Sequence, residues 1–103
     1  MSIFEKTLRP QTGIEAGLLQ FEKTEGAVLL DVRSPEEYEG GHLAGSVNLP
    51  LNRLAAIDYP KETPLFVYCH SGARSSRACA FLTRQGYRAE NLGGLMDYHG
   101  PLE

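Results

Sequence analysis

The segment from Cys69 to Arg77 combines the residue types that could carry out chemistry in this chain. Cys69 ends the apolar run Leu65–Tyr68, a short loop containing Gly72 follows, and Arg74 closes the loop. A loop between a buried strand and a helix brings backbone N–H groups together, and the helix N-terminus adds a positive potential. Such surroundings lower the pKa of a cysteine well below its free value of about 8.5. We therefore expect an activated sulfur nucleophile that faces a pocket for an anionic substrate.

An inert cysteine is the alternative interpretation of Cys69, because free cysteines are commonly buried. That interpretation leaves unexplained the glycine, the three serines and the two arginines that follow it directly. The second cysteine, Cys79, falls in the second turn of the next predicted helix, beside Ala78 and Phe81, where we expect it to pack in the core. Because a helix rises about 1.5 Å per residue, Cys79 is too far along to form a disulfide with Cys69.

Composition limits the kinds of protein that this chain can be. Its 103 residues, 42% of them hydrophobic, suit one domain over 1–103, and the formal net charge of −3 argues against a nucleic-acid binder. Residues 69–88 carry four arginines and no acidic residue, whereas the remainder has a net charge of −7. This contrast fits a local anion site or a solvated, arginine-rich helix face. Cysteine and histidine show no metal-ligand spacing, so no metal is expected.

The sequence also bears on the compartment. No apolar run approaches the roughly 18 residues that a membrane span requires, and MSIFEKTLRP lacks the apolar stretch of a signal peptide. Two cysteines are too few for a disulfide framework. We therefore expect a cytoplasmic protein that binds neither membrane nor nucleic acid.

Alternating strands and helices are expected to position the loop. Apolar runs predict buried strands over 27–32 and 65–68, with shorter strands over 46–49 and 88–92. Helices are predicted from a capping box at Thr12–Glu15 to Gly26, from a second box at Ser34–Glu37 to Tyr38, over 51–57 and over 75–85. This order predicts an α/β domain with a mainly parallel sheet, whose ligands bind beyond the carboxyl ends of the strands. Asp31 and Cys69 stand at two such ends.

These motifs together resemble a known family. The run Cys69-His-Ser-Gly-Ala-Arg74-Ser75 resembles the active-site loop of single-domain rhodanese-like (thiosulfate:cyanide) sulfurtransferases, a Cys-x-x-Gly-x-Arg pattern. Further similar segments follow the family's order: LLDVR (29–33), SPEEY (34–38), GHLAGSVNLP (41–50), Gly86-Tyr87 and NLGG (91–94). The resemblance is strongest over 14–95 and implies a rhodanese-like three-layer domain, a central mainly parallel sheet flanked by helices. Many members have a tryptophan after the Gly-Gly turn, where this chain offers Tyr98 or His99.

The resemblance also implies a mechanism. Cys69 would attack the sulfane sulfur of a small anionic donor such as thiosulfate, and the resulting persulfide would pass its outer sulfur to cyanide or a thiol. Backbone amides of residues 70–75 would hold that sulfur. The loop residues implied for this role are His70, Ser71, Gly72, Ala73, Arg74 and Ser75. No cofactor is implied, and we expect a monomer.

The roles of three charged residues, Arg74, Asp31 and Arg33, stay open at this point. Arg74 either faces the substrate anion or turns away and holds the loop through a carboxylate such as Asp31. Asp31 and Arg33 either form a second wall of the pocket or take part in structural ion pairs, for example Arg33 with Glu37.

The remaining polar residues have simpler expected roles. His70 is expected at the mouth of the site, where it helps to bind an anion, and a general-base role is disfavoured because the loop already produces a thiolate. Ser71 and Ser75 shape the loop, and Ser75 can also cap the helix. His42 is expected to be structural, with its ring bonded to backbone, and His99 to be solvated.

Two other functions fit parts of the sequence. A non-catalytic rhodanese module could carry a persulfide or bind a partner, although inactive modules usually lose the cysteine that is intact here. Phosphatases and arsenate reductases of related fold use a Cys-x5-Arg loop, which suits a tetrahedral phosphate. Cys69 and Arg74 enclose only four residues, and the narrower loop favours sulfur.

Overall fold

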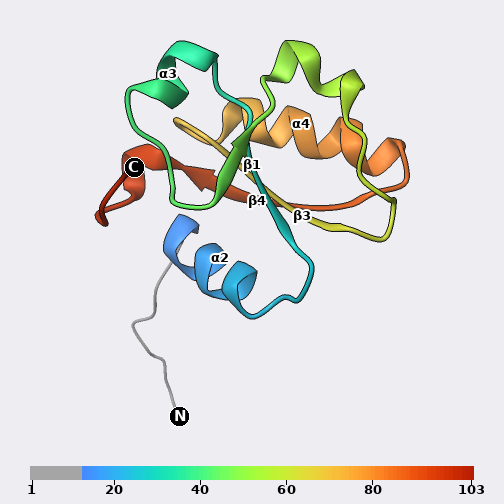
Figure 1. Ribbon diagram of the computed structural model, residues 1–103, viewed down its shortest axis with the longest axis horizontal. Coiled ribbons are helices and arrows are strands. Elements are labelled where there is room, and N and C mark those ends of the chain that lie inside the picture. Colours follow the sequence, from blue (N-terminus) through green and yellow to red (C-terminus); the bar gives the residue numbers. More distant parts are fainter. Residues whose placement is uncertain (1–12) are drawn as a thin grey trace.

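A four-stranded parallel sheet forms the centre of the described part of the chain, residues 13–103 of a computed structural model (Figure 1). The strands lie in the order β2-β1-β3-β4. Their bounds are Val28–Asp31 for β1, Ser46–Asn48 for β2, Pro64–Cys69 for β3 and Arg88–Gly94 for β4. Helix α2 (Gly13–Glu22) packs on one face of the sheet and α4 (Ala73–Arg84) on the other. The predicted α/β domain with a parallel sheet between helices is confirmed.

Strand β3 is buried on both faces of the sheet, which explains its continuously apolar sequence. Leu65 and Val67 belong to the hydrophobic cluster on the α4 side, whereas Phe66 and Tyr68 belong to the cluster on the α2 side. Successive strand side chains point to opposite faces, so a strand covered on both faces needs apolar residues at every position. Its neighbour β1 is buried in the same way, and the two strands end side by side near Cys69.

Helix α3 (Pro35–Glu39) begins at the predicted capping box. The Glu37 N–H donates to Ser34 Oγ at 3.2 Å, and the Ser34 N–H donates to Glu37 Oε1 at 3.1 Å. This helix has no fully buried residue, so the box and the proline at its first position define it more than packing does. The box predicted at Thr12–Glu15 includes Thr12, which lies outside the described residues.

Two helices differ from their predictions. The segment predicted as a helix over 51–57 forms a 3₁₀ helix, η1 (Leu51–Ala56), which, unlike α3, begins without a side-chain cap. Helix α4 begins two residues before its predicted start, because Gly72 has a φ of 100° and turns the chain into the helix. Ser75 therefore lies inside α4, and its predicted capping role is wrong: Gly72 is the N-cap residue.

Strand β4 approaches the loop after Cys69 closely. Between its pairings with Val67 and Tyr68 of β3, it carries one additional residue, Leu92, which marks an irregularity in the ladder. A Cβ on Gly94 would overlap the carbonyl oxygen of His70. This approach therefore requires glycine at position 94, the last residue of β4.

The end of the chain returns to the loop that follows α3. After the 3₁₀ helix η2 (Leu95–Asp97), backbone hydrogen bonds of 3.1 and 2.8 Å join Glu103 and His42 in both directions. The His42 ring stacks on Tyr38, and Nδ1 lies 2.8 Å from the Tyr38 carbonyl oxygen, which confirms its structural role. His99 is exposed, as predicted. No helix within residues 13–103 is long and apolar enough to cross a membrane.

Candidate active site

The sulfur of Cys69 lies where β3 meets the loop that leads into α4. The Gly72 N–H donates to Sγ at 3.0 Å and the Ser75 N–H at 3.4 Å, and Ser75 Oγ lies 3.4 Å from Sγ. Burial alone would raise the pKa of Cys69. The Ser75 hydroxyl and the backbone N–H groups of the loop outweigh that effect, and the pKa is lowered from its ordinary value. The fold therefore brings hydrogen-bond donors onto a buried sulfur.

The loop covers this sulfur. The sequence predicts a sulfur that faces a pocket, whereas here Cys69 has no exposed surface. His70 and Ser71 are exposed, and the loop is tied to η2 by a hydrogen bond of 3.0 Å from the Met96 N–H to the His70 carbonyl oxygen. The loop thus contacts two segments that are distant in sequence from the cysteine, Gly94 at the end of β4 and the 3₁₀ helix η2.

Ser75 links the sulfur to β4 through Asn91. The Ser75 hydroxyl donates to Asn91 Oδ1 at 2.6 Å, and the same oxygen accepts from the Gly93 N–H at 3.0 Å. A hydroxyl has one proton, so a Ser75 that donates to Asn91 can only accept from the Cys69 thiol. Donation to a Cys69 thiolate requires the hydroxyl to turn away from Asn91. Sequence reasoning did not assign Asn91 to the site, although Asn91 is the first residue of the family-like segment NLGG (91–94).

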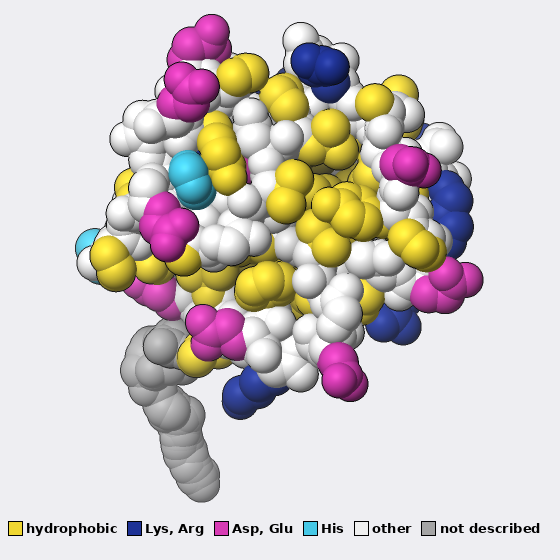
Figure 2. Space-filling view, viewed as in Figure 1, with side chains coloured by type: hydrophobic (Ala, Val, Ile, Leu, Met, Phe, Trp, Pro, Cys, Tyr) yellow, Lys and Arg dark blue, Asp and Glu magenta, His cyan; other side chains and the backbone are white. Residues whose placement is uncertain are grey.

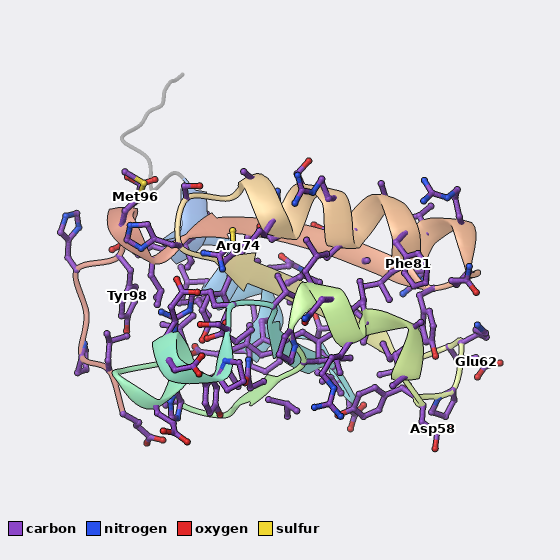
Figure 3. The ribbon with its side chains drawn as sticks, turned by 90° about the horizontal axis from the view of Figure 1, so that it is seen from above. Asp58, Glu62, Arg74, Phe81, Met96 and Tyr98 are labelled. Carbon is purple, nitrogen blue, oxygen red and sulfur yellow. The ribbon has the colours of Figure 1, made fainter. Side chains whose placement is uncertain are left out.

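Arg74 lies in the first turn of α4, on the side that faces α3 and η1 (Figure 3). Its guanidinium donates to both carboxylate oxygens of Glu37, at 2.7 and 3.0 Å. Against the opposing effect of burial, this pairing lowers the pKa of Glu37 to about 2. The prediction that Arg74 pairs with Asp31 is therefore wrong. The capping box holds Glu37 at the start of α3, where it meets the loop, although nothing in the sequence paired it with Arg74.

Asp31 and Arg33 form a second, buried ion pair. Arg33 Nε and Nη2 both donate to the Asp31 carboxylate, with a shortest distance of 2.7 Å, and Nη2 also donates to the Gly41 carbonyl oxygen. The side chains are 7% and 0% exposed, so they lie beneath the surface and do not form a pocket wall. The predicted pairing of Arg33 with Glu37 is wrong, because Arg33 folds back onto Asp31.

The chemistry open to this arrangement is nucleophilic. Donors around a buried sulfur stabilise a thiolate, or an anionic sulfur attached to it, without a charged side chain in contact with Sγ. Across residues 13–103, no three His, Cys, Asp or Glu side chains gather in a way that could hold a metal ion.

Comparison with known proteins identifies the family. Residues 16–100 match the rhodanese-like domain, and the chain belongs to this family. It is 40% identical over 74 residues to a protein of Allochromatium vinosum named sulfurtransferase, a match that covers 69% of each chain. It is 39% identical over 77 residues to thiosulfate sulfurtransferase PspE of Escherichia coli, covering 70% of this chain and 74% of PspE.

A solved structure agrees with these matches. The structure described as rhodanese with anions from E. coli is 35% identical and has a TM-score of 0.67, over 75% of this chain and 96% of that chain. The family resemblance predicted from the motifs is confirmed.

Proposed function

We propose that this chain is a sulfurtransferase that moves a sulfane sulfur from a small anionic donor such as thiosulfate to cyanide or a thiol, through a persulfide on Cys69. The observation that carries the proposal is the pair of N–H groups, from Gly72 and Ser75, that donate to Sγ at 3.0 and 3.4 Å. These donors stabilise the thiolate before the reaction and the anionic persulfide after it. The names of the relatives support the same class of reaction.

In each half of the reaction, a nucleophile attacks the transferred sulfur and displaces the group bonded to it. The Cys69 thiolate attacks the outer sulfur of thiosulfate, the S–S bond of the donor breaks, and sulfite leaves with the bonding electron pair. Cyanide or a thiolate then attacks the outer sulfur of the persulfide, and the electron pair of that S–S bond returns to Cys69. Neither half-reaction needs an external oxidant or reductant.

The burial of Cys69 places a condition on the first step. Because Cys69 has no exposed surface, a donor reaches Sγ only after part of the surrounding loop moves. Gly72 supplies the backbone freedom for this movement. In the proposed reaction His70 then stands at the mouth of the site, and Arg74 supports the loop through Glu37 without contacting the donor.

The free thiols of Cys69 and Cys79 fit a reducing compartment such as the cytoplasm. We propose the monomer as the active form.

A thiocyanate assay combined with mass spectrometry tests the proposal. Incubation with thiosulfate should add about 32 Da, one sulfur atom, to the Cys69 peptide. Cyanide should remove the added mass and release thiocyanate, and Cys69→Ser should do neither. Absence of both the adduct and thiocyanate would overturn the proposal. An adduct that cyanide and thiols cannot remove would instead indicate a storage module, and turnover of a phosphate ester would indicate phosphatase chemistry.

A further inference from the structure

A recess of about 390 Å³ adjoins the catalytic loop, and we call it the loop recess. It is lined by Val32, Ser34, Pro50, Leu51, Asn52 and Arg74. Val32 directly follows β1, whose last residue, Asp31, pairs with Tyr68 of β3. Val32, the residue after β1, and Cys69, the last residue of β3, each follow this pair, and both belong to one hydrophobic cluster. The loop recess therefore borders the reactive cysteine on its β1 side.

The lining of the loop recess offers no unpaired charge. Val32, Pro50 and Leu51 are apolar, and the Ser34 hydroxyl is bonded to Glu37. Arg74 is the charged lining residue, and both of its terminal nitrogens already donate to the Glu37 carboxylate. Its position between the start of α4 and the elements α3 and η1 can be followed in Figure 3. A second anion in the recess would have to compete with Glu37, whereas an uncharged chain would contact apolar walls.

We propose that the loop recess binds the uncharged aliphatic arm of a small thiol while the sulfur of that thiol accepts the sulfane sulfur from Cys69. The inference rests on the proposed function and names the acceptor class. The thiolate sulfur attacks the outer sulfur of the persulfide, the S–S bond to Cys69 breaks, and its electron pair returns to Cys69. The acceptor leaves as an organic persulfide. The volume suits such an arm, because small-molecule sites measure roughly 300–1,000 Å³.

The experiment compares two acceptors that share a three-carbon chain, 1-propanethiol and 3-mercaptopropionate, on protein loaded with thiosulfate and freed of donor. Loss of the persulfide is followed by mass spectrometry, and each rate is corrected for the fraction of thiolate. We expect 1-propanethiol to react about tenfold faster, because a carboxylate in the recess meets apolar walls, and the one charged residue in its lining, Arg74, is already paired with Glu37. Equal rates for the two acceptors would overturn the inference.

Charge substitutions in the recess sharpen the test. Leu51→Lys and the exposed Asn52→Lys each place a free cation in the lining, and we expect them to lower the rate ratio about tenfold. Asn52 serves as the second variant because its side chain is not needed for packing. A ratio that both substitutions leave unchanged would overturn the inference.

A separate recess of about 340 Å³ supplies the matched control. Its lining includes Val47, Leu49, Ile57 and Tyr59, and Figure 2 shows hydrophobic side chains gathered there, between β2 and η1. Val47 is 43% exposed on the edge strand. Val47→Lys should leave the ratio unchanged, and an equal change in this variant would overturn the inference by showing a nonspecific effect of charge.

Cyanide separates failure of this inference from failure of the proposed function. Cyanide has no arm to occupy the recess, so thiocyanate formation reports sulfur transfer alone. Thiocyanate formed with no selectivity between the two thiols overturns the recess assignment only. Absence of the persulfide and of thiocyanate overturns the proposed function and the recess assignment together.

Discussion

Cys69 and Cys79 are both free thiols that pack against the same hydrophobic cluster, yet their pKa values shift in opposite directions. Cys69 is the more deeply buried, and its pKa is lowered. Cys79 is partly buried, and burial together with the nearby Glu90 carboxylate raises its pKa to about 11. Burial disfavours both thiolates, so the difference arises from the available hydrogen-bond donors.

The helix explains which cysteine receives donors. Cys69 precedes α4, where the first N–H groups have no partner within the helix and can point at the sulfur. Cys79 lies inside α4, where backbone N–H groups already donate to carbonyl oxygens one turn earlier. Two cysteines ten positions apart thus have pKa values that shift in opposite directions, and the following substitutions test this contrast.

Replacing the two cysteines in turn should have the largest effect. We expect Cys69→Ser to lower sulfur transfer at least about 10³-fold, because loss of a catalytic nucleophile costs that much or more. Cys79→Ser should stay within about twofold of the parent, as for a side chain outside the reaction. Thiocyanate formation from thiosulfate and cyanide measures both. A large loss in Cys79→Ser with the fold intact would mean that the second thiol takes part.

Removing the Ser75 hydroxyl should raise the pKa of Cys69 towards that of Cys79. Ser75→Ala eliminates a donor to the thiolate, so the pKa of Cys69 should rise and its alkylation by iodoacetamide at neutral pH should slow about tenfold. The pH dependence of alkylation measures the shift. Ser76→Ala, on the exposed next residue, is the control and should leave the profile in place. An unmoved profile in Ser75→Ala would show that backbone donors suffice.

Removing the Asn91 side chain should shift the pKa of Cys69 in the opposite direction to Ser75→Ala. The Ser75 hydroxyl has two oxygen acceptors besides the sulfur, Asn91 Oδ1 at 2.6 Å and the Gly72 carbonyl oxygen at 3.1 Å. Asn91→Ala removes the nearer one, so we expect the hydroxyl to donate more often to the sulfur, the pKa of Cys69 to fall and alkylation at neutral pH to rise a few-fold. A merely structural role predicts the reverse, because a loosened loop loses donors. In the Ser75→Ala background the substitution should bring no increase. A rise of the pKa in Asn91→Ala would contradict the proton competition.

Weakening the ion pair between Glu37 and Arg74, which supports the loop, should have the smallest effect, a small loss of stability. Glu37→Gln keeps a capping-box residue but removes the charge that pairs with Arg74, and should lower the free energy of unfolding at pH 7 by about 0.2–1 kcal/mol, as for exposed pairs. Urea unfolding measures it, with exposed Glu36→Gln as the control.

The same pair predicts a pH dependence. The pKa of Glu37 is lower in the folded than in the unfolded chain, so its contribution is complete above about 4.5 and is lost as pH falls towards about 2. The stability difference between the parent and Glu37→Gln should therefore shrink over that range. A constant difference would show that the ion pair contributes nothing.

Local features of the chain were predictable. The capping box at Ser34 joins residues three positions apart, and the apolar runs that form β1 and β3 report burial on two faces. The loop from Cys69 to Arg74 was recognisable because its cysteine, glycine and arginine are neighbours in sequence. Each of these features depends on backbone geometry over a few residues.

The contacts that tune the cysteine were not predictable in this way. Glu37 and Arg74 are 37 positions apart, and Ser75 and Asn91 are 16 apart. An arginine can pair with any carboxylate that the fold brings near. Whether Arg74 pairs with Glu37 or with Asp31 therefore depends on where α3 packs. By itself, the sequence determined an α/β chain of the rhodanese-like family with one cysteine before a helix. Tertiary structure decided that this sulfur is buried, that Asn91 accepts the proton of the neighbouring Ser75 hydroxyl and that Glu37 holds the loop, because packing alone brings distant residues together.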